Sequence, residues 1–129
     1  MKNLHFLRTW LSIGLFLISS VFYLCLRDIH LTPTNIPSFD KLLHLTCYFL
    51  LSYYFSNIVI KKNFLKTTIP LIIMGILIEF LQRETGYRSF EYNDMVANTI
   101  GCLMGFTISR YIYADLLVHI EKYVLRVSR

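Results

Sequence analysis

Charged residues are missing from two long stretches of this chain. None occurs in the 18 residues between Arg8 and Arg27, or in the 19 residues between Lys41 and Lys61. A largely apolar stretch of about 18 or more residues is long enough to cross the hydrocarbon core of a bilayer as one helix. Helices of a soluble bundle normally keep a polar stripe, so this absence argues against a compact soluble protein.

The sequence also lacks the short motifs of several enzyme classes. It contains no P-loop, no GxGxxG, no HExxH and no nucleophile elbow. Its three cysteines, Cys25, Cys47 and Cys102, stand at unrelated spacings inside apolar segments. They form no zinc or redox pattern, and we interpret them as packing residues. The sequence therefore identifies no cofactor and assigns no metal.

Four apolar segments predict an all-α protein, an integral membrane bundle of four transmembrane helices in a single domain. Lys2 and Arg8 precede the first segment, as in a signal peptide, but its apolar run is longer than usual and no small-x-small cleavage pattern follows. We therefore expect a retained helix. The amphipathic tail 115–129 either continues the fourth helix or lies along the membrane interface. The helices are predicted at about 9–26, 42–60, 67–82 and 95–114.

The basic residues predict the orientation of these helices. The formal net charge is +5, which we attribute to membrane topology and not to nucleic-acid binding, because Lys and Arg collect in short cytoplasmic loops. Four crossings put the amino terminus, loop 61–66 and the tail on one side with nine basic residues, against four on the other side. Both termini are thus predicted to be cytoplasmic, while loop 27–41, with Pro33 and Pro37, faces outward.

Polar residues recur at helical spacing near the outer ends of three predicted helices. Residues three or four apart share a helix face, so each helix presents one polar stripe. The topology brings the stripes to the same side of the membrane, where Arg88, in the loop between the last two helices, can reach over them. The stripes are Asp40, His44 and Tyr48; Gly75, Glu79 and Gln82; and Asp94, Asn98, Gly101 and Gly105.

Glu79 is the clearest sign that these side chains converge. An ionised group inside a transmembrane helix is costly unless it is paired or hydrated, so Glu79 is expected to face the bundle interior. Its expected partner is Arg88, Lys41 or His44. Polar groups of this kind can serve only to tie helices together by hydrogen bonds. Because so many ionisable groups gather in one place, we favour a binding or catalytic site.

Two further patterns indicate packing and interfacial positions. Gly101 and Gly105 form a GxxxG motif, which favours close helix–helix contact, and we expect it to face the predicted helix 67–82. Gly75 is assigned to helix packing as well. The residues suited to interfacial aromatic belts are Trp10, Tyr111 and Tyr113.

In these residues the sequence resembles the VanZ-like family, which is named for a protein linked to teicoplanin resistance. The resemblance covers about 40–105, three of the four predicted helices, and the order and spacing of the motifs agree. Leu45 departs from the pattern, because phenylalanine is expected after the histidine. The matching pieces are Asp40-Lys-Leu-Leu-His44 with Tyr48, Gly75-Ile-Leu-Ile-Glu79-Phe-Leu-Gln82, and Arg88-Ser-Phe-Glu-Tyr-Asn-Asp94-Met-Val-Ala-Asn98-Thr-Ile-Gly101 with Gly105.

The resemblance implies a bacterial, multi-pass protein of the inner (cytoplasmic) membrane, in a family mostly without an assigned biochemical activity. Its named member suggests a role near the cell envelope or its glycopeptide-sensitive precursors. Resistance itself is not carried over to this chain, since family and fold do not fix function.

Two hypotheses give the outward-facing site a function. In the first, it binds membrane lipids, namely an anionic head group or a lipid-linked envelope precursor: Lys41 and Arg88 hold the phosphate, and Asn98 orients it. In the second, the site is catalytic, with Glu79 or Asp94 as general base and His44 as general acid. Arg88 then stabilises phosphate charge. The other ligand-binding candidates are Asp40, Tyr48 and Gln82.

Three alternatives remain open. His44, Glu79 and Asp94 could together ligate a divalent metal, which three helices make geometrically possible. The chain could instead be a non-enzymatic accessory or assembly subunit of a homo- or hetero-oligomer, in which the polar residues only hold the helices together. Proton or ion transport ranks last, because the inner halves of the predicted helices offer only scattered Ser, Thr and Asn.

Overall fold

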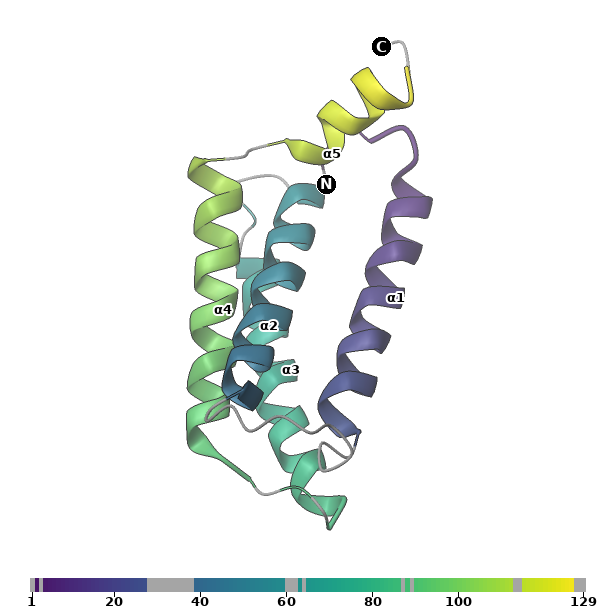
Figure 1. The fold of residues 1–129 in the computed structure, drawn as a ribbon. Coiled ribbons are helices and arrows are strands. Elements are labelled where there is room, and N and C mark those ends of the chain that lie inside the picture. The colour runs from purple at the N-terminus through teal and green to yellow at the C-terminus, as the bar shows by residue number, and fades with distance from the viewer. Residues whose placement is uncertain are drawn as a thin grey trace.

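The described part of the chain is entirely helical, which confirms the all-α prediction. The computed structural model describes residues 2, 4–27, 39–59, 63, 65–86, 88, 90–112 and 115–126. Four long helices, each of 20 residues, are followed by a short carboxy-terminal helical segment (Figure 1). The elements are α1 (Leu7–Leu26), α2 (Phe39–Ile58), α3 (Leu65–Glu84), α4 (Tyr92–Tyr111), α5 (Leu116–His119) and the π-helical turn η3 (Ile120–Val124).

The four long helices match the predicted segments in order, but their ends differ. Each begins two or three residues earlier than predicted, because the first turn of a helix accepts polar residues where its N–H groups have no intrahelical partner. Helix α2 ends at Ile58, and α4 ends at Tyr111 instead of about 114. Asp115 adopts the left-handed conformation, with φ 67°, which turns the chain away from α4. The predicted features outside the described residues are Pro33, Pro37, Lys61, Lys62, Tyr113 and the tail end 127–129.

Successive long helices run in alternate directions, as Figure 1 shows. Helices α1 and α3 therefore end where α2 and α4 begin, and we call this the site end of the bundle. Both chain termini lie at the opposite end, the terminal end. Helix α2 contacts each of the other three long helices, and its contact with α4 is the most extensive.

The close contact between α2 and α4 depends on two glycines. A Cβ at Gly101 would overlap the carbonyl oxygen of Leu45 and lie 3.0 Å from the amide nitrogen of Phe49. A Cβ at Gly105 would overlap the carbonyl oxygen of Phe49. The GxxxG motif thus packs on the backbone of α2, and the prediction that it faces the third helix is wrong. Its spacing indicates close packing but carries no information about which helix lies opposite.

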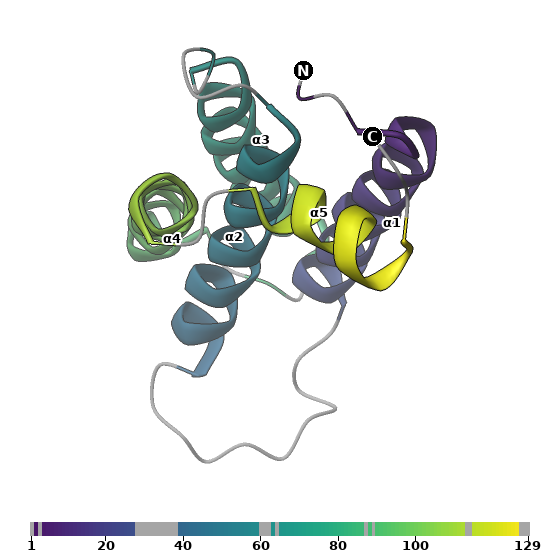
Figure 2. The same ribbon diagram turned by 90° about the horizontal axis from the view of Figure 1, so that it is seen from above.

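The carboxy-terminal segment folds back over the terminal end, where α5 lies across the ends of α2 and α1 (Figure 2). The Glu121 carboxylate accepts hydrogen bonds from the backbone amides of His5 (2.7 Å) and Phe6 (2.9 Å) and from Trp10 Nε1 (2.8 Å). A salt bridge of 2.8 Å joins Lys2 to Asp115 nearby. The tail therefore caps the amino-terminal end of α1 and does not continue α4. Glu121 is buried, although it is one of the charged residues of the amphipathic tail.

The bundle buries charged and polar groups beside an apolar core and leaves many large apolar side chains on its outer faces. Its buried side chains include His44, Glu79 and Asp94, whereas large apolar side chains such as Leu15 and Phe16 are exposed on the outer faces. Water disfavours such exposed apolar surface, but hydrocarbon accepts it. Helices α1 and α3 are each long and apolar enough to cross a membrane. These properties are the ones expected of an all-helical membrane protein.

Hydroxyl groups on the outer helix faces fit the same environment. Ser20 Oγ donates a hydrogen bond to the carbonyl of Phe16 at 2.9 Å, and Thr107 Oγ1 donates one to the carbonyl of Leu103 at 2.7 Å. Both bonds reach back four residues within one helix, so they satisfy the hydroxyl without water.

Candidate functional site

The predicted polar side chains meet at the site end of the bundle. The alternating helix directions explain why: the first turns of α2 and α4 lie beside the last turns of α3. The segment between α3 and α4 adds one further cation. Those brought together are Asp40, Lys41 and His44 of α2, Glu79 and Gln82 of α3, Arg88, and Asp94 and Asn98 of α4.

His44 lies at the centre of this cluster and is fully buried. Its Nδ1 is 3.1 Å from Asn98 Oδ1, and its Nε2 is 3.4 Å from the amide nitrogen of Gln82. An amide oxygen only accepts and an amide nitrogen only donates, so a neutral ring carries its proton on Nδ1. The lone pair of Nε2 then accepts the long contact from Gln82, on the side of the ring that faces Asp40 and Asp94.

The orientation of the two amides is fixed by their other hydrogen bonds. Gln82 Nε2 donates to the carbonyl of Cys25, at the end of α1, at 2.8 Å. Asn98 Nδ2 donates to the carbonyl of Gly75 at 3.5 Å. Each amide therefore presents a defined group to His44, and α1 takes part in the site through its backbone.

Three carboxylates surround the imidazole. Glu79 Oε1 lies 3.7 Å from His44 Nδ1. Asp40 Oδ1 and Asp94 Oδ2 lie 4.0 and 3.9 Å from His44 Nε2. Glu79 and Asp94 come from different helices and are both buried, so the fold holds acidic groups together away from water, at a cost in desolvation that ordinary packing does not require.

The permanent cations of the cluster are paired with other carboxylates. Arg88 Nη2 donates to Asp40 Oδ2 at 2.5 Å. Lys41 Nζ lies 2.6 Å from Glu91 Oε2 and 3.6 Å from Asp94 Oδ1. Of the expected partners of Glu79, the structure therefore gives His44.

Glu91 belongs to the cluster, although the sequence reasoning did not select it. Besides pairing with Lys41, it donates its backbone N–H to Glu79 Oε2 at 3.4 Å. A signal was available: Glu91 stands three residues before Asp94 within the conspicuous segment that begins at Arg88. As the residue before the first turn of α4, it shares the site end with the other acids.

Tyr48, Gly75 and the GxxxG glycines occupy positions deeper in the bundle. Tyr48 is fully buried, and its ring lies 3.2 Å from the point that a Cβ at Gly75 would occupy. Its hydroxyl has no hydrogen-bond partner within the described residues. Gly101 and Gly105 lie on the α2–α4 contact and touch none of the charged groups in their closest approaches.

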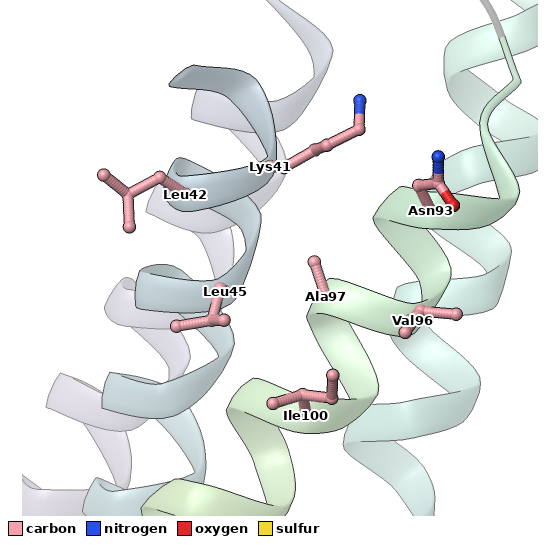
Figure 3. A pocket seen from close by; sticks show the side chains of 7 residues that line it. All are labelled: Lys41, Leu42, Leu45, Asn93, Val96, Ala97 and Ile100. Carbon is pink, nitrogen blue, oxygen red and sulfur yellow. The ribbon is translucent and has the colours of Figure 1, made fainter. Parts of the chain in front are cut away.

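A groove runs along the outside of the bundle between α2 and α4 (Figure 3). Its volume is about 390 Å³, and most of its lining is apolar. Lys41 and Asn93 stand at one end of it, at the site end, and Ile100 stands at the other. Lys41 therefore belongs to both the groove and the buried cluster. The remaining lining residues are Leu42, Leu45, Val96 and Ala97.

These features define the class of the protein, an all-helical membrane protein with a buried polar cluster at one end of its bundle. A sequence model of the family VanZ/LLP1 matches residues 2–114. The chain therefore belongs to the VanZ-like family, which confirms the family prediction. No curated protein and no solved structure matches the chain. The catalytic and binding roles of the individual side chains stay predictions.

Proposed function

We propose that this chain is a bacterial inner-membrane protein that crosses the bilayer four times, with both termini in the cytoplasm. Its outward-facing site end binds an anionic lipid head group or a lipid-linked envelope precursor. The observation that supports this proposal best is the groove between α2 and α4, which combines apolar walls with an ammonium group at one end.

The groove fits an amphipathic ligand that lies parallel to the helices. Leu45, Ala97 and Ile100 line its apolar length, where an acyl or isoprenyl chain would pack. In a bilayer this contact replaces similar contacts with lipid tails, so it adds little net affinity. Selectivity must therefore come from the polar end, at Lys41 and Asn93.

Lys41 has the capacity to bind phosphate in this position. An ammonium group has three donors, and Glu91 and Asp94 occupy two directions around it. Its side chain is 32% exposed, so a head group can reach it without unfolding the site. The amide of Asn93 at the same end adds a neutral donor.

The carboxylates set the depth at which an anion can bind. Asp94 is buried 3.6 Å from Lys41, and Glu79 is buried on the Nδ1 side of His44. Both carboxylates would repel a phosphate placed among them. The head group therefore binds at the rim, against Lys41. If the bound lipid is also processed, acid–base chemistry would fall to His44, Glu79 and Asp94, which lie directly behind it.

Lipid binding to the purified protein tests the proposal. Native mass spectrometry would compare the retention of phosphatidylglycerol, undecaprenyl phosphate and phosphatidylcholine. We expect the two anionic lipids to be retained in preference to phosphatidylcholine. Lys41→Gln should weaken their binding about tenfold, because a hydrogen bond to a charged group contributes about 1.5 kcal/mol or more. Ile100→Trp should weaken it too, by filling the groove.

Matched variants separate these effects from general damage. Lys66→Gln removes the same charge at the other end of the bundle, near the start of α3. Leu103→Trp adds the same bulk to an exposed position on α4 outside the groove lining. Both should bind lipid like the wild type. If Lys41→Gln and Ile100→Trp also bound lipid normally, the polar residues would be internal ties, and the accessory-protein hypothesis would replace this one.

A further inference from the structure

Asp40, His44 and Asp94 form a set of potential metal ligands at the site end. Each offers one ligand atom, and the three atoms lie within 4.8 Å of one another. Two atoms bound to one ion at about 2.0–2.2 Å are at most about 4.4 Å apart. The distances of 4.0 and 3.9 Å from His44 Nε2 to the two carboxylates fit this limit. A small side-chain rotation would bring the third distance, between the oxygens of Asp40 and Asp94, within it as well.

In Asp40 and in Asp94, one carboxylate oxygen lies near a permanent cation and the other is directed toward His44. Asp40 directs Oδ2 to Arg88 and Oδ1 toward His44 Nε2. Asp94 places Oδ1 3.6 Å from Lys41 and Oδ2 toward the same nitrogen. Each cation thus orients a carboxylate whose second oxygen points at the imidazole. This arrangement leaves two oxygens and one nitrogen facing a common point.

The state of His44 agrees with a role as ligand. A metal-binding histidine usually donates its other ring N–H to an oxygen, which fixes the ring and its tautomer. Here Nδ1 lies 3.1 Å from Asn98 Oδ1. Nε2 is consequently the ring nitrogen with a lone pair, and it faces Asp40 and Asp94. A bound ion would replace its 3.4 Å contact with the Gln82 amide nitrogen, which keeps its hydrogen bond to the carbonyl of Cys25.

Asp94 provides an independent sign that a partner belongs in the cluster. Its side chain is 2% exposed, yet the nearest permanent cation, Lys41, stays 3.6 Å from its Oδ1, beyond hydrogen-bond distance, and Oδ1 accepts no hydrogen bond from any described residue. The charge of Asp94 is therefore only partly compensated, and its Oδ2 remains directed toward His44 Nε2. The ion pairs of the cluster also involve four carboxylates, those of Asp40, Glu79, Glu91 and Asp94, but only two permanent cations. Glu79 and Asp94 are the buried members of this set. Excess negative charge around them is costly, and one divalent cation would offset it.

We propose that Asp40, His44 and Asp94 bind a divalent transition-metal ion, Mn²⁺ or Zn²⁺. Carboxylates suit Mn²⁺, and imidazole together with carboxylate suits Zn²⁺. The three protein ligands leave further coordination positions for water. Glu79, expected from the sequence as a ligand, lies instead on the Nδ1 side of the ring. The proposal does not rest on lipid binding, since the metal alone is its probe.

Metal titration of the purified protein tests this site. The protein would be prepared in detergent with its affinity tag removed and treated with EDTA. Mn²⁺ binding would be followed by electron paramagnetic resonance, and Zn²⁺ by elemental analysis after desalting. We expect one ion per chain. Asp40→Asn and His44→Ala should each weaken binding at least tenfold, since loss of even an outer-shell partner costs about 10–100-fold in affinity.

Glu84→Gln is the matched control, because it removes a carboxylate charge from an exposed position at the end of α3 and leaves the cluster and its three ligands intact. It should bind Mn²⁺ within about twofold of the wild type. Added Mn²⁺ should raise the melting temperature of the wild type and of Glu84→Gln, but not that of Asp40→Asn. Asp40 is partly exposed, so this variant keeps the test valid if His44→Ala fails to fold. Absence of binding to the wild type, or equal binding by all variants, would overturn the proposal.

Discussion

Replacing Gly105 with alanine should separate the two helices that form the centre of the bundle. The new Cβ would overlap the carbonyl oxygen of Phe49 and lie 2.8 Å from the amide nitrogen of Tyr53. Both atoms belong to the backbone of α2 and cannot rotate away. Ordinary van der Waals contact begins at 3.4 Å, so the Tyr53 nitrogen alone requires α4 to move outward by about 0.6 Å, and the closer carbonyl oxygen of Phe49 requires a larger shift. The hydrogen bond from Ser52 to the carbonyl of Cys102, now 2.6 Å, would lengthen with it.

The expected loss of stability follows from this displacement. Inserting one methyl group into a well-packed contact costs about 1–3 kcal/mol. For a chain of this size, 1 kcal/mol corresponds to roughly 3–5 °C in melting temperature. Gly105→Ala should therefore melt roughly 3–15 °C below the wild type. Gly101→Ala should behave similarly, because its Cβ also meets backbone atoms of α2.

The three buried cysteines supply the assay. Cys25, Cys47 and Cys102 are free and buried, so a thiol-reactive dye reports their exposure on heating. Gly14→Ala is the control. Its Cβ would lie 2.8 Å from the end of the Phe55 ring, which can move aside, so its melting temperature should fall less. If Gly105→Ala melted no lower than Gly14→Ala, the close backbone contact would be refuted.

Two further predictions concern the terminal end and the orientation of the bundle. Glu121→Ala removes the acceptor for His5, Phe6 and Trp10. The fluorescence of Trp10, the single tryptophan of the chain, should therefore shift to the red, and the tail should become sensitive to protease. An unchanged spectrum would contradict the contact between Glu121 and the start of α1. With cytoplasmic termini, green fluorescent protein fused to the carboxy terminus should fluoresce, and alkaline phosphatase fused after Thr85 should be active. The opposite pattern would reverse the proposed orientation.

Much of the site could be predicted from helical spacing and alternating helix direction. Asp40 and His44 stand four residues apart on one helix, and Asp94 and Asn98 on another. Their meeting requires only that neighbouring helices run in opposite directions, which short connections impose. The lipid environment added a physical reason for Glu79 to turn inward. The order of the helices and most members of the polar cluster followed from these facts, but Glu91 did not.

The pairing of charges could not be predicted in the same way. Glu79 has several cations within reach in sequence terms, and the structure gives Arg88 to Asp40 and Lys41 to Glu91. Which pairs form depends on the path of the backbone between α3 and α4, and helical spacing does not predict that path. The neighbour of the GxxxG motif depends likewise on the lateral arrangement of helices.

The fate of Glu121 shows a related limit. In sequence it belongs to the polar side of an amphipathic tail, and nothing near it indicates a partner. Its partners are the backbone amides of His5 and Phe6, more than a hundred residues away. Free N–H groups at the start of any helix attract a carboxylate, but the sequence does not predict which carboxylate will bind them.

The groove between α2 and α4 opens through the side of the bundle, among apolar side chains. A molecule that enters there leaves the surrounding leaflet directly and never passes through water. Its occupancy would then depend on its mole fraction in the membrane and on diffusion in two dimensions. Dilution of the protein in buffer at constant lipid composition should leave that occupancy unchanged.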